Sequence, residues 1–212
     1  MSPSKTPLTA LVLTGAAVML SACVSLFPKA EPAQLYRFGP QAEAGADLST
    51  APGRVNVTLA QIEFTPASAG DRLLTMNGAE AAYISGARWV SPAQDLFEAS
   101  VRNAFAASPQ VRLVEPRRAM TSNLVLDLKV DNFEARYDAG PKAAPTAVVT
   151  VHARMIRYPD RTVVGDHMFR ATQTAGDNRV GAIVPAYDAA VGAVLKELTP
   201  WTEQIAAKNA GR

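Results

Sequence analysis

The segment Leu124-Val125-Leu126-Asp127-Leu128-Lys129-Val130 carries the clearest secondary-structure signal in the chain. Apolar residues occupy every second position, while Asp127 and Lys129 fall on the other face, which is the period of a half-buried β-strand. Beyond Asp131 the apolar residues shift by one position, to Phe133, Ala135 and Tyr137. Because a strand repeats every two residues, this shift predicts a β-bulge near Asp131-Asn132, unless the strand ends there on that side.

Two more strands are expected after this segment. Alternate residues of 149–155 are apolar, so this stretch should present one face to the core. The sequence Tyr158-Pro159-Asp160-Arg161 is typical of a tight turn, and residues 163–172 can return as the next strand. With a loop over residues 138–145, the pattern predicts an antiparallel meander.

The region before residue 124 predicts shorter elements. Short strands are expected over residues 35–38, 54–59 and 111–114, a loop over 41–53, and a hairpin around Asn77-Gly78. A helix should begin at Ser91-Pro92 and end at Ser108-Pro109. Its apolar stripe is formed by Phe97, Val101, Ala104 and Phe105.

The last predicted element is a helix entered near Pro185. One face of it carries apolar residues spaced by three and four positions: Tyr187, Val191, Val194, Leu198 and Trp201. Thr199-Pro200 predicts a kink or a break just before Trp201, and residues 204–212 read as a fraying tail. The order of elements predicts a single α+β domain, with a mainly antiparallel sheet covered on one face by two helices.

The N-terminus carries a separate signal that ends at Leu20-Ser21-Ala22-Cys23. Lys5 provides a positive charge, residues 8–20 form an apolar core, and small residues precede the cysteine, as in an export signal. The pattern resembles the lipobox of bacterial lipoproteins, which implies cleavage after Ala22 and attachment of S-diacylglycerol and an N-acyl chain such as palmitate at Cys23. The alternatives are an ordinary secretory signal with an incidental cysteine and a short N-terminal anchor. Because the resemblance to the lipobox holds at every position and Cys23 is the only cysteine, we assign it as a lipidation site.

This assignment divides the chain into a signal peptide (1–22), a lipidated tether (23–33), a domain (34–206) and a tail (207–212). The second residue of the mature chain is Val24, not the aspartate associated with inner-membrane retention, so we expect the periplasmic face of the outer membrane. The 190 residues left after cleavage carry 20 Lys and Arg against 19 Asp and Glu. This balance argues against nucleic-acid binding, which requires a basic face.

The sequence offers few candidates for catalysis or metal binding. His152 and His167 are the two histidines and fall on different predicted strands, with no second cysteine to complete a zinc site. Lys129 stands among the carboxylates of its strand, which indicates a solvated, charge-balanced face; these carboxylates are Asp127, Asp131 and Glu134. Trp89 and Trp201 are expected to pack in the core or at its edge. We therefore expect no enzyme, no metal site and no cofactor besides the lipid at Cys23.

Several motifs follow one another in a recognisable order. The lipobox precedes Tyr36-Arg37-Phe38, and Trp89-Val90-Ser91-Pro92 leads into the amphipathic helix. The strand at 124–133, the segment at 167–171 and a helix ending in Leu198 and Trp201 complete the series. This order resembles the ABC-type transport auxiliary lipoproteins, a family similar to paraquat-inducible protein C, over nearly all of the mature chain. Trp89, Pro92 and Trp201 form the candidate structural motif that carries the resemblance.

The resemblance implies a periplasmic domain that works beside an MCE-domain protein and an ABC permease and ATPase. We expect a non-enzymatic adaptor that is anchored to the membrane by lipid and supports lipid transport between the inner and outer membranes; a homo-oligomer is left open. The alternative is a periplasmic lipid- or solute-binding protein with its own apolar pocket. An envelope hydrolase ranks last because the sequence shows no nucleophile–base pair.

Overall fold

The computed structural model describes residues 32–39, 53–116 and 122–209, and the residues from Ala33 to Arg212 form one compact unit. The signal peptide and most of the expected tether and of the 41–53 loop lie outside the described residues. In chain order the elements are β1 (Gln34–Tyr36), β2 (Val55–Leu59), β3 (Glu63–Phe64), α2 (Pro66–Ala69), β4 (Arg72–Asn77), β5 (Glu80–Trp89), α3 (Ala93–Ala106), β6 (Val111–Val114), β7 (Leu124–Arg136), β8 (Thr146–Arg157), β9 (Thr162–Thr174) and α4 (Val180–Asn209). The unit is therefore of the α+β class, as predicted.

The sheet is organised around β7. On one edge, β7 pairs antiparallel with β8, which pairs antiparallel with β9, so the predicted meander is confirmed. On the other edge, β7 pairs in parallel with β2, β3 and β4 in turn. The prediction of a mainly antiparallel sheet is wrong, because the sheet is mixed. Parallel neighbours need long crossover connections, here through the segments that carry α2 and α3, and local alternation does not reveal them.

The predicted bulge in β7 is present. The register with β8 shifts between Val130 and Asn132, so Asp131 is the extra residue. Val130 and Phe133 are both buried in the same core despite the odd spacing between them. The bulge therefore keeps the apolar side of β7 inward along its whole length. Thr65, at the start of α2, donates its hydroxyl to the carbonyl oxygen of Asp131 at 3.0 Å.

An aromatic cluster fills the core where β1, β5, β7 and α4 meet. The ring of Phe133 lies 5.0 Å from that of Phe38 and 4.9 Å from that of Tyr187. Trp89 packs edge-on against Tyr187 at 5.3 Å. The hydroxyl of Tyr187 donates to the carbonyl oxygen of Leu74 at 3.1 Å, and burial raises the pKa of this phenol. Rings in these tilted and edge-on arrangements add specific attraction to the area they bury.

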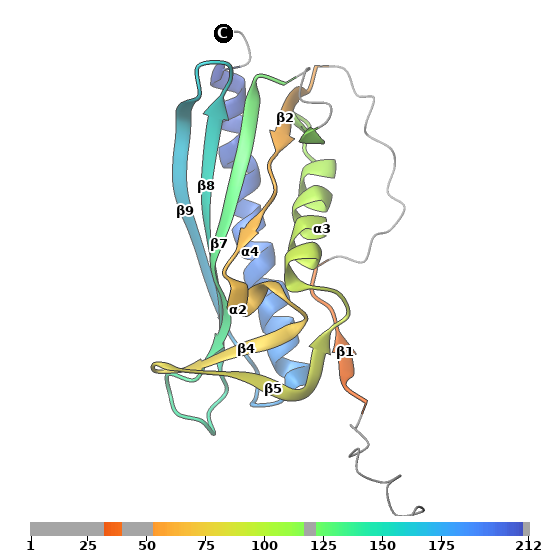
Figure 1. The fold of residues 1–212 in the computed structure, drawn as a ribbon, viewed down its shortest axis with the longest axis vertical. Helices are drawn as coiled ribbons and strands as arrows, with labels where there is room; N and C mark the ends of the chain where they lie inside the picture. The colour runs from red at the N-terminus through yellow and green to blue at the C-terminus, as the bar shows by residue number, and fades with distance from the viewer. Residues whose placement is uncertain (1–31, 40–52, 117–121, 210–212) are drawn as a thin grey trace, which may run out of the picture. The chain divides into compact units, whose positions relative to one another are not determined.

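Helix α4 lies behind the β7–β9 meander in Figure 1. It differs from its prediction at both ends, because it begins at Val180 instead of near Pro185 and continues without a break through Pro200 to Asn209. Pro185 and Pro200 each remove one backbone hydrogen-bond donor from the helix. Buried residues nevertheless flank both prolines: Ile183, Val184 and Ala186 lie around Pro185, and Leu198 and Thr202 lie around Pro200. Packing of this face therefore outweighs the local preference of proline, and most of the expected tail belongs to the helix.

Gly39 connects the end of β1 to the helix layer. Its φ of 81° lies in the left-handed region, and its amide donates to Oδ1 of Asp188 in α4 at 2.7 Å. A Cβ atom added there would lie 2.1 Å from Oγ of Ser100 in α3. A side chain at this position would therefore force β1 away from both helices.

Candidate functional site: the uncovered face of the β7–β9 meander

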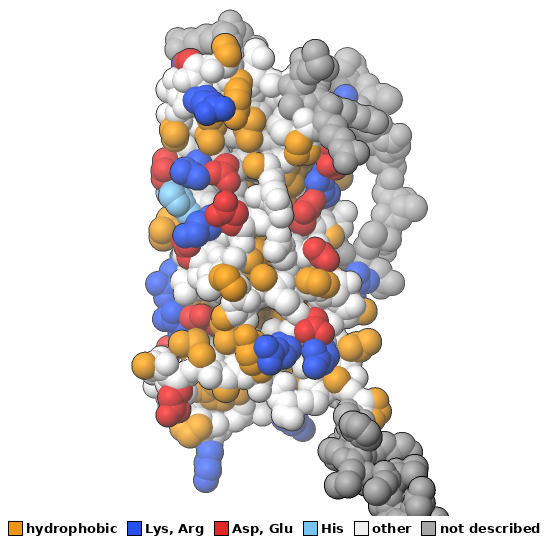
Figure 2. Space-filling view, in the orientation of Figure 1, with side chains coloured by type: hydrophobic (Ala, Val, Ile, Leu, Met, Phe, Trp, Pro, Cys, Tyr) orange, Lys and Arg blue, Asp and Glu red, His pale blue; other side chains and the backbone are white. Residues whose placement is uncertain are grey.

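The outer face of β7, β8 and β9 is turned away from α4 and lies toward the viewer in Figures 1 and 2. Two rows of side chains cross it. Asp127, Arg154 and Asp166 stand opposite one another on successive strands, and the next row contains Lys129, His152 and Met168. Figure 2 shows acidic, basic and histidine side chains beside one another over this region, with apolar side chains among them. The face therefore combines charge with accessible apolar surface.

An ion pair lies within the first row, and a hydrogen bond between His152 and Asp166 joins the two rows. Arg154 Nη2 lies 2.5 Å from Oδ2 of Asp127, and Nε2 of His152 lies 2.8 Å from Oδ1 of Asp166. We call these four residues the charged ladder. Beside it, Nζ of Lys129 lies 2.9 Å from Oδ1 of Asp131, whose hydrogen bond and negative charge raise the pKa of this lysine. The charges of this face are balanced, as predicted, but Glu134 is not solvated: it is buried, and its Oε1 lies 2.6 Å from Nη2 of Arg136.

The two histidines lie on opposite faces of the sheet. His152 belongs to the charged ladder, and its directly opposed neighbours, Lys129 and Met168, offer no hydroxyl or thiol nucleophile. His167 lies on the α4 side, with its ring 4.6 Å from Phe169 and 6.4 Å from Trp201. The pairing of His152 with Asp166 escaped the sequence analysis, because it depends on the register between β8 and β9. Within the described part of the chain, no three His, Cys, Asp or Glu side chains gather as metal ligands.

Three large apolar side chains are exposed in this half of the domain, and we call them the hairpin patch. Val163 and Met168 of β9 are 50% and 57% exposed, and Tyr158 in the β8–β9 turn is 42% exposed. Ile156 stands opposite Val163 on the neighbouring strand and is half-buried. Exposed apolar side chains rimmed by charged ones are typical of surfaces that bind other proteins.

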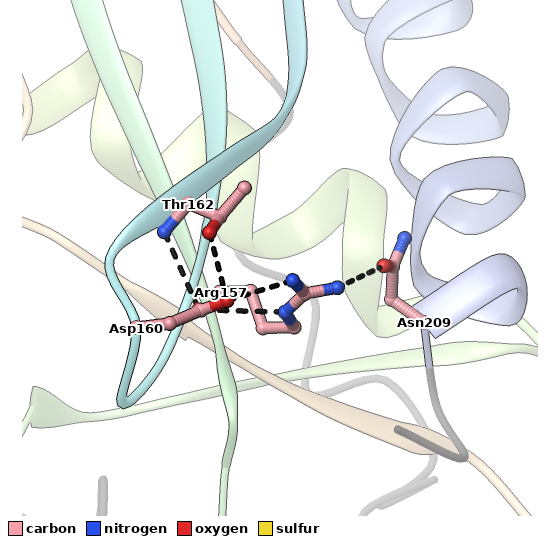
Figure 3. A network of polar contacts seen from close by, with 4 residues as sticks. All are labelled: Arg157, Asp160, Thr162 and Asn209. Carbon is pink, nitrogen blue, oxygen red and sulfur yellow. Dashed lines mark hydrogen bonds and ion pairs between the residues drawn. The ribbon is translucent and has the colours of Figure 1, made fainter.

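A polar network fixes the turn that carries part of this patch (Figure 3). Asp160 accepts hydrogen bonds from Nη2 of Arg157 and from the hydroxyl of Thr162, both at 2.7 Å. Nη1 of Arg157 reaches Oδ1 of Asn209, in the last turn of α4, at 3.4 Å. The hydrogen bonds from Arg157 and Thr162 hold the pKa of the Asp160 carboxyl well below its usual value. These contacts restrain the hairpin end, and a restrained surface loses less conformational entropy when it binds a partner.

The residues of the candidate motif have structural positions. Trp89 is buried in the aromatic cluster, and Pro92 directly precedes the first residue of α3. Trp201 is half-buried between α4 and β9, where its ring lies 5.7 Å from Phe169. A Cβ atom on Gly165 would lie 3.0 Å from Cζ2 of Trp201, so the glycine makes room for the indole. The expected packing of both tryptophans is confirmed, and neither lies in the charged ladder.

The predicted lipidation site, Cys23, lies outside the described residues. Among the helices that the structure describes, none combines the length and the apolar character needed to cross a bilayer.

The domain has an α+β fold and exposes a face on which charged side chains lie beside apolar ones. The chain belongs to the family of ABC-type transport auxiliary lipoprotein components, whose model matches residues 36–199. The matched range includes the aromatic cluster, the charged ladder and the hairpin patch. The family is a transport component and not a family of enzymes.

Solved structures share the fold at low sequence identity. A Xanthomonas campestris protein described as DUF330 is 22% identical, with a TM-score of 0.69 over 84% of this chain and 100% of its own. An uncharacterized protein is 12% identical, with a TM-score of 0.60 over 80% of this chain and 98% of its own. A hypothetical protein from Chlamydia trachomatis is 12% identical, with a TM-score of 0.51 over 74% of this chain and 99% of its own. No curated protein sequence matches the chain significantly.

Proposed function

We propose that the chain is a lipid-anchored periplasmic adaptor of an ABC transport system of the MCE type, which moves lipids between the inner and outer membranes. The observation that carries this proposal is the hairpin patch, which stays exposed on a domain of a transport auxiliary family. The partner is an MCE-domain protein that receives lipid from the ABC permease and ATPase. The domain binds this partner and performs no chemistry of its own.

The anchor of the adaptor is the S-diacylglycerol and N-acyl lipid on Cys23. The lipobox at residues 20–23 and the absence of any second cysteine support this assignment. Several buried acyl chains contribute about 0.8 kcal/mol per CH₂ group, so attachment is effectively permanent. Val24 supports delivery to the outer membrane, where the domain would face the periplasm.

The interior of the domain favours an adaptor over a carrier with its own lipid pocket. Apolar residues of β7, β8, α3 and α4 form one continuous buried cluster between the sheet and the helices. Tyr187, Phe133 and Leu128 in its centre are almost wholly inaccessible to solvent. Close-packed interiors of this kind have few voids larger than a water molecule.

Copurification and complementation together test the proposal. The lipidated chain should capture the MCE-domain protein of the same organism and should restore a deletion strain. A form lacking residues 1–23 should complement poorly, because anchoring raises the effective concentration of the adaptor beside its partner. The variant His167→Ala, on the α4 side of the sheet and outside the charged ladder, serves as the control and should retain function. Full complementation by the unanchored form, with no captured protein and a copurifying acyl ligand, would establish a free lipid carrier instead.

A further inference from the structure

A second exposed apolar site lies at the start of the domain, on the outer face of β1 and β5. Leu35 is 63% exposed and Val90 is 49% exposed. Leu35 stands opposite Arg88, and the amide of Val90 donates to the carbonyl oxygen of Tyr36 at 2.7 Å. Because side chains alternate along strands, Leu35, Arg37 and Val90 share one face, while Tyr36 and Trp89 point to the core side. We call these three residues the tether corner.

The two arginines of this region differ in their partners. Arg88 forms an ion pair with Asp71 at 2.8 Å, so its charge is balanced. Arg37 is exposed, and within the described residues no hydrogen bond or ion pair holds its guanidinium. The tether corner therefore presents two apolar side chains beside one uncompensated positive charge. This combination suits the interface of an anionic phospholipid layer, where apolar groups insert and arginine binds phosphate.

We propose that the tether corner rests on the phospholipid surface to which the chain is anchored, an inference that depends on lipidation of Cys23 in the proposed function. The tether reaches β1 after 11 residues, which span at most roughly 35–40 Å when fully extended. Leu35 of the tether corner therefore follows the predicted lipidation site by 12 residues (35 − 23). Within the compact unit, the β8–β9 turn lies at the opposite end from β1 (Figure 1). Contact at the tether corner directs the hairpin patch away from the membrane, toward the partner.

Weak contact is enough for this orientation. The lipid anchor holds the domain at a high local concentration above the bilayer, so the corner needs no independent affinity for membranes. The predicted consequence is a preferred orientation, in which residue 35 approaches the lipid and residue 163 does not. A domain that tumbles freely on its tether would bring both positions to the lipid equally often.

Fluorescence quenching in vesicles measures this orientation. The full mature chain is prepared in lipidated form with Leu35→Cys or, as the control, Val163→Cys. Since the lipid occupies the thiol of Cys23, each variant has one free thiol for an environment-sensitive fluorophore. The vesicles contain phosphatidylethanolamine and phosphatidylglycerol, with nitroxide on a fraction of the headgroups. Flotation and mass measurement report lipidation separately, so failure of the anchor is distinguished from failure of the orientation.

We expect the probe at position 35 to be quenched at least about twofold more strongly than the probe at position 163. Adding Arg37→Glu should reduce this difference in anionic vesicles and change it little in phosphatidylcholine vesicles. Equal quenching at both positions in protein that floats would overturn the proposal. Shielding of position 35 from soluble quencher without quenching by lipid would also overturn it, because a protein surface, such as a second copy, would then cover the corner.

Discussion

The two faces of the β7–β9 meander consist of alternate residues of the same strands, yet they differ in nearly every physical property. The inner face carries Val130, Val151 and Phe169, which are buried against α4 and the aromatic cluster. The outer face carries the charged ladder and the exposed Met168. The alternation therefore separates the residues that stabilise the fold from those available to a partner. Substitutions on the inner face should change stability, and those of exposed residues on the outer face should change binding.

The largest expected effect is at the centre of the inner face. Phe133→Ala removes a ring that packs against four other aromatic side chains: Phe38, Phe64, Trp89 and Tyr187. We expect the free energy of unfolding to fall by about 3–5 kcal/mol in urea titrations. The matched control is Lys129→Ala on the outer face of the same strand, which should change stability by no more than about 0.5 kcal/mol. Similar losses in the two variants would show that the faces are not separated in this way.

A second test adds volume to the inner face. In Gly165→Ala the new methyl group would lie 3.0 Å from Trp201 and 3.2 Å from Ile205. We expect overpacking to destabilise the domain by about 1–3 kcal/mol in thermal unfolding. Gly192→Ala in α4 is the control, because nothing lies within 4 Å of its Cβ position. That change should stabilise the helix by roughly 0.5–1 kcal/mol, and a loss of stability there would contradict the packing described.

Thr150 offers a smaller effect of opposite sign. Its side chain lies on the outer side of β8 but is buried, and in the described part of the chain its hydroxyl has no hydrogen-bond partner. Thr150→Val should therefore raise the free energy of unfolding by about 1 kcal/mol. In the control, Thr202→Val, the replaced hydroxyl donates to the carbonyl oxygen of Leu198 at 2.9 Å. The control should lose stability. If the free energy of unfolding changed in the same direction in both variants, the two hydroxyls would not differ in hydrogen bonding as described.

The smallest expected effect concerns pH and the turn of Figure 3. The contacts of Asp160 lower its pKa in the folded state below the usual 3.8. A carboxylate of this kind stabilises the fold above its unfolded-state pKa and loses this contribution as the pH falls toward the folded-state value. The variant Asp160→Asn should therefore have a lower melting temperature than the wild type at neutral pH. The difference between the two melting temperatures should become smaller below about pH 4. A difference in melting temperature that does not change with pH would show that the substitution acts through packing and not through the charge of Asp160.

Much of the fold could be predicted because it depends on local pattern. The alternation after Leu124, the bulge at Asp131 and the start of α3 at Pro92 all follow from residues close in sequence. The sequence could not predict the parallel pairing of β7 or the continuity of α4 through Pro200, because both depend on contacts between distant segments. The lipidation of Cys23 remains a prediction.

The hairpin patch was partly readable from the sequence. Alternation from Phe169 places Met168 on the opposite side of the strand, where an apolar residue is unexpected. The exposure of Tyr158 and Val163 depends on how the turn is held by Asp160, which no local pattern shows. The pairing of His152 with Asp166 likewise required the register of β8 and β9.

The most direct measurement is binding and unfolding of one outer-face variant, Met168→Glu, in the same preparation. Binding is measured with the immobilised domain and the purified MCE-domain protein of the same organism, and unfolding by thermal melting. We expect affinity to fall at least about tenfold, as for a central apolar contact, while the melting temperature stays at the wild-type value. Unchanged affinity, or a melting temperature that falls together with affinity, would contradict the assignment of binding to the outer face and of stability to the inner one.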